Sequence, residues 1–337
     1  MTGAMKLTQL QREFINHFQG RFPLDERPFQ VVADALGSSE KSIIEIVEKL
    51  GQEKLISRFG PLYDAARIGG GLTLAAMKVP EERYQMVTET VNSYREVAHN
   101  YRREHELNMW FVLATEKPED LHEIISSIEN ATGLTVFNFP KQQEFYIGLW
   151  LQLSPDGKHS TVPVPDQVQK PVMELAHNYH LDDTDRKLIS ATQAGFPVEP
   201  SPYKNIADNL GLSQGDVLQR LGNMLCSGVI RRIGAVPNHY RLGLTANGMT
   251  VWDVPDNKIE QLGKLIGQLD FVSHCYQRPR HLPVWPYNLF AMVHGHNEDE
   301  VKDKVKKIEA LLAKNCSSFE TLFSSAILKK TGLRLAA

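Results

Sequence analysis

The sequence predicts an α+β protein in which one structural plan is used twice. Two observations support this: short amphipathic helices precede alternating strands and helices, and the whole order recurs about halfway along the chain. The first helical region has apolar residues at three- and four-residue spacing, at Leu7, Leu10, Phe14 and Phe18. Because this spacing falls on one face of an α-helix, it predicts a helix packed on a core.

Two further helices are predicted by the same spacing and by their ends. Apolar residues recur helically over 29–36 and over 43–50. Gly37 suits the left-handed backbone that ends many helices, and the Ser38-Ser39 pair offers N-caps to the third helix. Three short helices followed by a strand near 55–58 are typical of a winged helix-turn-helix.

The next segment predicts a sheet with two helices. We expect a strand over 72–79, a helix over 82–94, strands over 97–103 and 107–114, a helix over 118–131 and a final strand region over 134–153. This βαββαβ order is the ferredoxin-like unit. A winged helix-turn-helix followed by such a unit resembles the Lrp/AsnC architecture, here in tandem.

The repeat is visible in the residues themselves. Arg21-Phe22-Pro23 recurs as Gly195-Phe196-Pro197, and the same offset carries 55–60 onto 229–234. Between the copies, several prolines with fixed φ and no amide donor suit an extended connector. The predicted units are a winged helix-turn-helix over 1–62, a ferredoxin-like domain over 68–153, a linker over 154–178, a second winged helix-turn-helix over 179–237 and a second ferredoxin-like domain over 242–330.

Composition describes an ordinary globular protein. Of 337 residues, 42% are hydrophobic and 23% are charged, and 37 Lys and Arg against 40 Asp and Glu leave a net charge of −3. This balance predicts no strongly basic surface for nucleic acid. Cys226, Cys275 and Cys316 have no paired C-x-x-C spacing, so neither a disulfide framework nor a zinc site is expected. Without a long apolar stretch for a membrane or a signal peptide, we expect a cytoplasmic protein.

The candidate DNA-recognition helices have little positive charge. The stretch 39–50 has two lysines against three glutamates, and 213–224 has one aspartate and one arginine. A recognition helix needs Arg, Lys, Asn or Gln at base edges and a basic flank for phosphates. We therefore expect the two helix-turn-helix units to serve packing and dimer geometry, with DNA not a principal partner.

Two strands carry the same polar trio on one face. Residues two apart share a face of a strand, so His99, Tyr101 and Arg103 point the same way. The second copy repeats the trio as His274, Tyr276 and Arg278. Since helices cover one face of a ferredoxin-like sheet, we expect the trio on the open face.

The neighbouring strand extends this pattern. Asn108 and Trp110 share a face, and Asn288 and Phe290 repeat the combination. A polar and aromatic open face is either a subunit or domain contact, or one wall of a ligand cavity. Its recurrence in both copies favours the cavity.

Basic side chains near this face narrow the ligand. Arginines gather at the element ends, namely Arg58, Arg67, Arg102, Arg103, Arg231, Arg232, Arg241, Arg278 and Arg280. Guanidinium groups suit a multiply carboxylated or phosphorylated molecule, although any single one is equally well a solvated surface residue. The second copy also has His239, His281, His294 and His296, of which one is able to ligate iron. Gly69-Gly70-Gly71 precedes a strand rather than a helix, so no nucleotide cofactor is implied.

Several longer segments carry a family resemblance. They are 98–103 with 108–111, 232–236 with 239–241, 246–249, 251–255, and 273–276 with 285–290. On them the chain resembles the siroheme decarboxylase family, in its fused NirD and NirL type, from about Leu7 to Leu328. The resemblance implies an enzyme that removes carbon dioxide from the acetate groups at C12 and C18 of siroheme, giving 12,18-didecarboxysiroheme in heme d1 biosynthesis. Since relatives with separate chains act as heterodimers, this chain is expected to be its own pseudo-heterodimer.

The implied chemistry assigns roles to the trio. Loss of carbon dioxide leaves a carbanion-like carbon that must take up one proton. His99 and His274 are the expected general acids, since an ordinary histidine pKa near ~6.5 suits that task. Tyr101 and Tyr276 are expected to orient the imidazole or relay the proton, while Arg103 and Arg278 hold carboxylates.

Further residues are expected to bind the substrate: Arg58, Arg102, Asn108, Trp110, Arg232, His239, Arg241, Trp285, Tyr287 and Asn288. No resident cofactor or metal is implied, because the iron arrives with siroheme, its axial ligand being expected among His99, His239 and His274. We expect the site where the two ferredoxin-like sheets face each other, with one or both pockets active. A homodimer and further Nir-type subunits stay open as partners. The alternative function is an Lrp/AsnC-type transcription regulator that senses heme or a small ligand.

Overall fold

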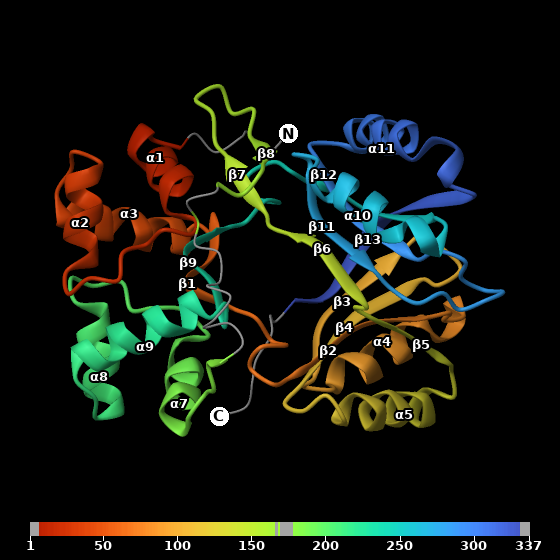
Figure 1. Cartoon of the computed structure of the whole chain (residues 1–337), viewed down its shortest axis with the longest axis horizontal. Helices are drawn as coiled ribbons and strands as arrows, with labels where there is room; N and C mark the ends of the chain where they lie inside the picture. Colours follow the sequence, from red (N-terminus) through yellow and green to blue (C-terminus); the bar gives the residue numbers. More distant parts are fainter. Residues whose placement is uncertain (1–6, 166–167, 169–177, 331–337) are drawn as a thin grey trace.

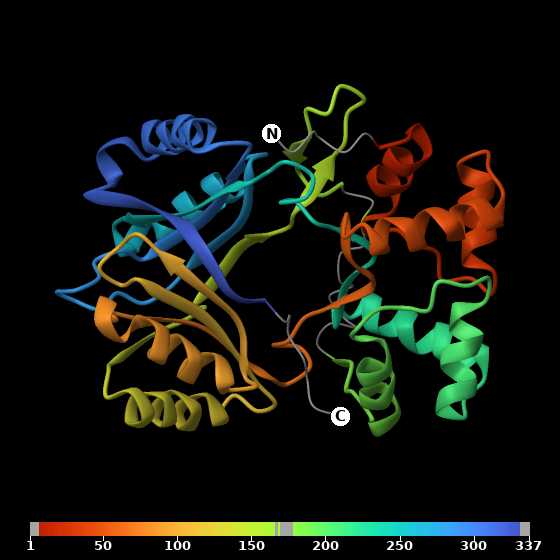
Figure 2. The same ribbon diagram turned by 180° about the vertical axis from the view of Figure 1, so that it is seen from behind.

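The computed structural model describes residues 7–165, 168 and 178–330. The helix-turn-helix units of the two halves lie together on one side, and a large curled sheet with its covering helices lies on the other (Figures 1 and 2). The α+β tandem arrangement predicted from the sequence is confirmed.

The helix-turn-helix units have the predicted helices. In the first half these are α1 (Gln9–Phe18), α2 (Pro28–Ala35) and α3 (Glu40–Gln52), and in the second α7 (Asp183–Thr192), α8 (Pro202–Leu210) and α9 (Gln214–Cys226). Thr8 and Asp182 start α1 and α7 with capping boxes, and α2 and α8 begin with proline, which suits the first helical turn. Ser39, a predicted N-cap, accepts a hydrogen bond from the amide of Ser42.

The strand expected to form each wing pairs with the other half. β1 (Ile56–Tyr63) and β9 (Ile230–Pro237) form a two-stranded antiparallel sheet in which Gly60 lies opposite Gly234. A Cβ on Gly234 would lie 2.1 Å from the backbone oxygen of Phe18, and one on Gly60 would lie 3.0 Å from Cα of Gly195. Both glycines are therefore needed where each strand crosses the end of the other half's first helix.

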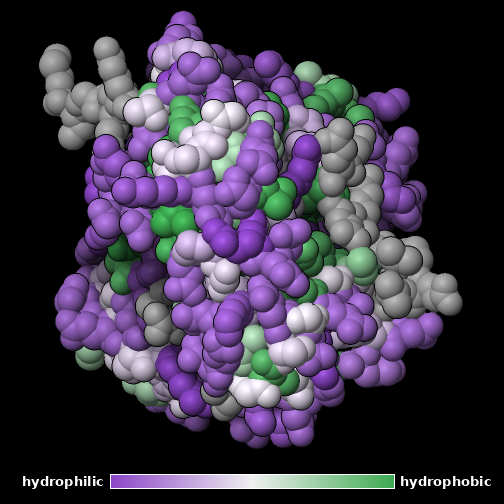
Figure 3. All heavy atoms as spheres, turned by 90° about the vertical axis from the view of Figure 1, so that its left-hand side faces the viewer, coloured by the Kyte–Doolittle hydropathy of each residue, from purple (hydrophilic) through white to green (hydrophobic). Residues whose placement is uncertain are grey.

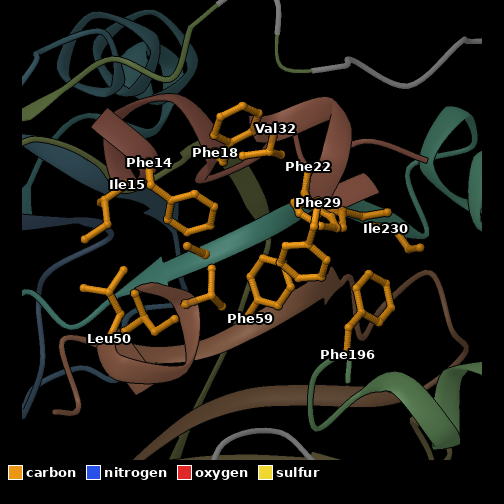
Figure 4. Close-up of a cluster of buried hydrophobic side chains, with 14 of the residues drawn as sticks. Phe14, Ile15, Phe18, Phe22, Phe29, Val32, Leu50, Phe59, Phe196 and Ile230 are labelled. Carbon is orange, nitrogen blue, oxygen red and sulfur yellow. The ribbon is translucent and has the colours of Figure 1, made fainter. Parts of the chain in front are cut away.

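One apolar core fills both helix-turn-helix units. Figure 4 shows Phe14, Phe22, Phe29 and Phe59 of the first half against Phe196 of the second. The rings of Phe22 and Phe59 are 4.7 Å apart and meet edge to face. The two units therefore pack as one body rather than as independent modules.

The ferredoxin-like units supply the curled sheet. The first half contributes β2 (Gly71–Met77), α4 (Tyr84–Ser93), β3 (Val97–Arg103), β4 (Met109–Thr115), α5 (Asp120–Thr132) and β5 (Val136–Pro140). The second contributes β10 (Ala246–Asp253), α10 (Ile259–Gly267), β11 (Val272–Gln277), β12 (Leu289–Gly295), α11 (Glu298–Leu312) and β13 (Ser318–Lys330). The sheet order is β5-β2-β4-β3-β13-β10-β12-β11-β6.

The two halves exchange their last strands. β13 pairs with β10 of its own half through its first residues and then with β3 of the first half, where Lys330 lies opposite His99. In return β6 (Gln143–Ile147), which follows β5, pairs with β11, and Ile147 lies opposite His274. The predicted final strand region 134–153 is therefore divided, and only β5 remains in the first half's own sheet.

The space between the two half-sheets is filled with aromatic side chains. Trp110, Phe139, Trp285 and Phe290 form a buried cluster, with the rings of Trp110 and Trp285 5.1 Å apart. The helices cover the opposite faces over two further apolar clusters. This central region therefore leaves no room for a ligand among the packed rings, and a site between the facing sheets stays a prediction for the part beside the cluster.

A short hairpin follows the exchanged strand. β7 (Trp150–Gln152) pairs with β8 (Ser160–Val162). β7 lies just before the segment 154–178 that was expected to be the linker, and β8 lies within it. The rest of that expected linker lies largely outside the described residues. Among the helices that the structure describes, none combines the length and apolarity needed to cross a membrane.

Candidate active site

The polar trio lies on one face of β3, as predicted, and again on β11. The rings of His99 and Tyr101 are 6.2 Å apart, and the guanidinium of Arg103 is 5.8 Å from the centre of the Tyr101 ring. On β11 the rings of the corresponding histidine and tyrosine, His274 and Tyr276, are 5.9 Å apart, and Arg278 lies 5.1 Å from the tyrosine ring. The two trios are thus matched in geometry.

A β-bulge precedes the histidine in both copies. Pairing with the neighbouring strand shifts between Val97 and His99, and again between Val272 and His274. A bulge adds a residue to one strand and redirects the side chains that follow. The same local device therefore aims both imidazoles.

The surroundings of His99 come from the second half of the chain. Lys330 is its cross-strand neighbour on β13. The Lys330 ammonium lies 4.9 Å from the centre of the Tyr240 ring, in the loop after β9, and the His239 ring is 4.3 Å from the Tyr240 ring. The first trio therefore gains a cation and the Tyr240 ring, both remote in sequence, while the His239 ring also contacts His294 near the second trio.

The surroundings of His274 are different. Ser273 Oγ lies 2.8 Å from His274 Nδ1 and 2.6 Å from His294 Nε2, so the three side chains form a hydrogen-bonded row. On β6, Glu144 pairs with Arg231 at 3.1 Å. Glu144 is the cross-strand neighbour of Tyr276, so the second trio has a carboxylate nearby that partly balances its cations.

Burial changes the protonation of the histidines. It lowers the pKa of His99 to about 4, and the positive charge of Lys330 adds to the effect. Burial likewise lowers the pKa of His239 and of His274 to about 4. All three are therefore neutral in the free protein near neutral pH, in contrast to the ordinary pKa expected from the sequence.

Three arginines in or beside the trios have a buried N–H group without a hydrogen-bond partner among the described residues: Nε of Arg103, Nε of Arg278 and Nη1 of Arg232. Arg103 donates from Nη1 to the backbone oxygen of Leu322 at 2.6 Å, and Arg278 donates to that of Phe139. Burial lowers the pKa of each arginine to about 10, so each stays charged at neutral pH. A buried cation with a free donor suits an anionic ligand.

Four residues expected to bind substrate make contacts within the fold. The side-chain amide of Asn108 accepts from the amide N–H of Val79 at 2.9 Å and donates to its carbonyl at 2.8 Å, and Asn288 does the same with Val254. Trp110 and Trp285 are fully buried in the aromatic cluster between the half-sheets. Trp110 and Trp285 therefore do not line a ligand-accessible wall, because pleat direction alone does not reveal what packs against a face. Substrate contacts of Asn108 and Asn288 stay a prediction.

Other expected contacts also lie elsewhere. Arg102 points away from its neighbours in the trio and pairs with Glu81 at 2.6 Å. Tyr287 donates from its hydroxyl to Glu320 at 2.7 Å, at the edge of the aromatic cluster. Arg58 donates to the backbone oxygen of Gln193 at 2.8 Å, between the helix-turn-helix units.

Arg241 is exposed in the same loop as His239. His239 and Arg232, in contrast, are close to the trios: His239 packs against Tyr240 and His294, and the charge of Arg232 helps to lower the pKa of His274. Of the residues expected to bind substrate, these two therefore keep a place beside the expected catalytic residues.

The sequence did not single out Lys330, Tyr240, Ser273 or Glu144 as site residues. Tyr240 stands beside His239 in one of the segments that carry the family resemblance, so a signal was present. Lys330 and Glu144 reach the trios only through the exchange of β13 and β6. Strand exchange cannot be recognised from the local sequence, because the side chains of an exchanged strand alternate between the two faces as they would in a sheet of its own half.

The helix-turn-helix face is mostly hydrophilic (Figure 3), yet the cations of its two candidate recognition helices are paired. On α3, Lys41 lies 3.8 Å from Glu45 and Lys49 lies 3.9 Å from Glu53. On α9, Arg220 contacts Asp182 at 2.8 Å. Each basic side chain of the two candidate recognition helices therefore already has an acidic neighbour, which disfavours binding to phosphates.

Comparison with known proteins identifies the family. The AsnC-like ligand binding domain family matches residues 68–146 and 241–329, and the siroheme decarboxylase NirDL-like HTH domain family matches 11–56 and 185–231. The siroheme decarboxylase of Hydrogenobacter thermophilus is 32% identical over 320 residues, covering 94% of this chain and 92% of that protein. This chain belongs to the siroheme decarboxylase family.

Other members of the siroheme decarboxylase family match the whole chain or half of it. The NirDL subunit of Paracoccus pantotrophus is 29% identical over 98% of this chain and 99% of its own length. The NirH subunit from the same organism is 57% identical, covering 46% of this chain and 96% of that subunit. A separate subunit that corresponds over nearly its whole length to about half of this chain is consistent with the internal repeat.

Solved structures of this family have the same fold. The crystal structure of the siroheme decarboxylase NirDL aligns with a TM-score of 0.72 at 28% identity, covering 97% of this chain and 94% of that one. The structure of NirDL in complex with an iron-uroporphyrin III analogue aligns with a TM-score of 0.70 at 28% identity, over 96% of this chain and 93% of that one. The tandem architecture is thus that of a siroheme decarboxylase.

Proposed function

We propose that this chain is a carboxy-lyase that removes carbon dioxide from the C12 and C18 acetate groups of siroheme, giving 12,18-didecarboxysiroheme in heme d1 biosynthesis. The observation that carries the proposal is the set of buried arginines with free N–H donors beside the histidines, since siroheme has eight carboxylates. No resident cofactor is proposed, because siroheme brings its own iron. Among the described residues, no group of three or more His, Cys, Asp or Glu is arranged to hold a metal ion.

The arginines act first, by binding. Arg103 and Arg278 each use one side of the guanidinium on a backbone oxygen and keep Nε available for a carboxylate. Charge-assisted hydrogen bonds of this kind fix the position of the acid groups. The acetate that reacts must lie outside the tightest of these contacts. A strong ion pair would stabilise its carboxylate more than the carbanion formed when carbon dioxide leaves, and would therefore slow the reaction.

The proton is delivered next. A neutral imidazole is a weak acid, and in the free protein the pKa of His99 is about 4. Carboxylates entering beside it favour the imidazolium and therefore raise that pKa. His99 is thus charged by the arrival of substrate, and it then donates its proton to the carbon that has lost carbon dioxide. In this way the general acid is made available only when a substrate occupies the site.

The test is anaerobic incubation of the purified chain with siroheme, followed by mass spectrometry. We expect two successive losses of the mass of carbon dioxide. His99→Ala is expected to slow the reaction by about 10²–10⁴-fold, the usual contribution of general acid catalysis, while siroheme still binds. His122→Ala, at an exposed position on α5, is the matched control and is expected to leave turnover unchanged. Unaltered siroheme after incubation with the wild-type chain would contradict the proposed function.

A further inference from the structure

In the hydrogen-bonded row beside His274, the donor and the acceptor of each hydrogen bond can be assigned. Its outer end is Asn247, whose Oδ1 is bonded to His294 Nδ1, while its amide nitrogen faces the backbone oxygen of Thr245 at 3.4 Å. The side-chain oxygen of Asn247 is only an acceptor, so His294 Nδ1 must be the donor. Because burial holds the pKa of His294 well below its usual value, the ring is neutral and its Nε2 has no hydrogen.

The same assignment of donors and acceptors continues from His294 through Ser273 to His274. His294 Nε2 accepts from the hydroxyl of Ser273 at 2.6 Å, since a nitrogen without hydrogen can only accept. The single hydrogen of Ser273 is used in that bond, so its oxygen accepts from His274 Nδ1 at 2.8 Å. His274 is therefore the tautomer with hydrogen on Nδ1 and a free electron pair on Nε2.

The first half lacks this row. The strand register places Leu72 and Ala114 opposite each other where Asn247 and His294 lie opposite each other in the second half. Ala98 occupies the place of Ser273, immediately before the histidine. His99 Nδ1 is buried without a hydrogen-bond partner among the described residues. The two histidines, equivalent in the repeat, are thus held in different ways.

We propose that Asn247, His294 and Ser273 are positioning residues that present Nε2 of His274 to the substrate iron as its axial ligand, while His99 is the histidine that carries the proton. This division of labour rests on the proposed function, since it takes siroheme as the ligand. Hydrogen bonding at the second ring nitrogen is the usual way in which a metal-binding histidine is fixed in one tautomer. The duplicated chain has therefore specialised its two copies.

The tautomer is tested without substrate. In the protein labelled with ¹⁵N only at histidine, two-bond nitrogen–proton correlations distinguish the two neutral tautomers, and His274→Gln identifies the signals of His274. We expect the Nδ1–H tautomer in the wild type and a mixture of tautomers in Ser273→Ala, which has the residue that the first half uses at this place. The Nε2–H tautomer in the wild-type protein would overturn the inference, whatever the variants do.

The ligand is tested on bound substrate. In the nitrosyl adduct of ferrous siroheme, electron paramagnetic resonance resolves coupling to a second nitrogen when an imidazole lies opposite the nitric oxide. We expect that coupling in the wild type and in His99→Ala, its loss in His274→Gly, and its return when imidazole is added. Replacing ¹⁴N by ¹⁵N in the histidines is expected to change the splitting.

Two results would overturn the assignment of the ligand: no second coupling in the wild type, or coupling that persists in His274→Gly. These readouts are independent of turnover. A chain that shows the coupling but leaves siroheme intact would contradict the proposed decarboxylation and leave the ligand assignment standing. A chain that decarboxylates siroheme without the coupling would do the reverse.

Discussion

Acidification should destabilise this protein through its buried histidines. His99, His239 and His274 have a pKa of about 4 in the folded chain, against an ordinary value of about 6.5 once unfolded. The unfolded state therefore binds more protons below about pH 6.5, so the stabilisation is complete above that pH and is lost as the pH falls toward 4. Between pH 7 and pH 5 each histidine is expected to lower the free energy of unfolding by about 2 kcal/mol.

The assay is urea unfolding followed by circular dichroism at pH 7 and at pH 5. Replacing His99 by glutamine removes one of the three groups, so His99→Gln should lose about 2 kcal/mol less than the wild type between the two pH values. The exposed His122 provides the control, since His122→Gln should lose as much as the wild type. If His99→Gln has the wild-type difference between the two pH values, the argument that burial keeps His99 neutral is refuted.

Three further predictions follow from the site and the fold. Binding of siroheme near pH 7 should be accompanied by proton uptake, so the calorimetric heat of binding should depend on the ionisation enthalpy of the buffer. A heat that is the same in all buffers would contradict the charging of His99 by substrate. Lys330→Met should raise KM for siroheme severalfold by removing a cation beside His99, whereas Lys158→Met in the exposed β7–β8 turn should not; equal KM values would exclude Lys330 from binding. Gly234→Ala should lower the free energy of unfolding by about 1–3 kcal/mol or more, because the new Cβ meets the Phe18 backbone oxygen; an unchanged urea midpoint would show that β9 shifts freely.

The sequence determined the local structure and the chemistry that each segment carries. Helical spacing over 43–50 with an N-cap at Ser39 was enough for α3, because both effects act within a few residues. Alternation along a strand likewise placed His99, Tyr101 and Arg103 on one face. The internal repeat then implied that a second trio exists, which β11 confirms.

The tertiary structure alone decided which side chains meet. The sequence assigned Trp110 and Trp285 to a ligand wall, yet the closing of the two half-sheets buries both in an aromatic core. Lys330 lies beside His99 because β13 crosses into the other half. The replacement of Ala98 by Ser273 in the second half creates a hydrogen bond only because His294 lies opposite the serine hydroxyl. Periodicity reports which face of its own element a residue occupies, whereas the identity of the neighbour depends on contacts between segments far apart in the chain, and no local pattern encodes these.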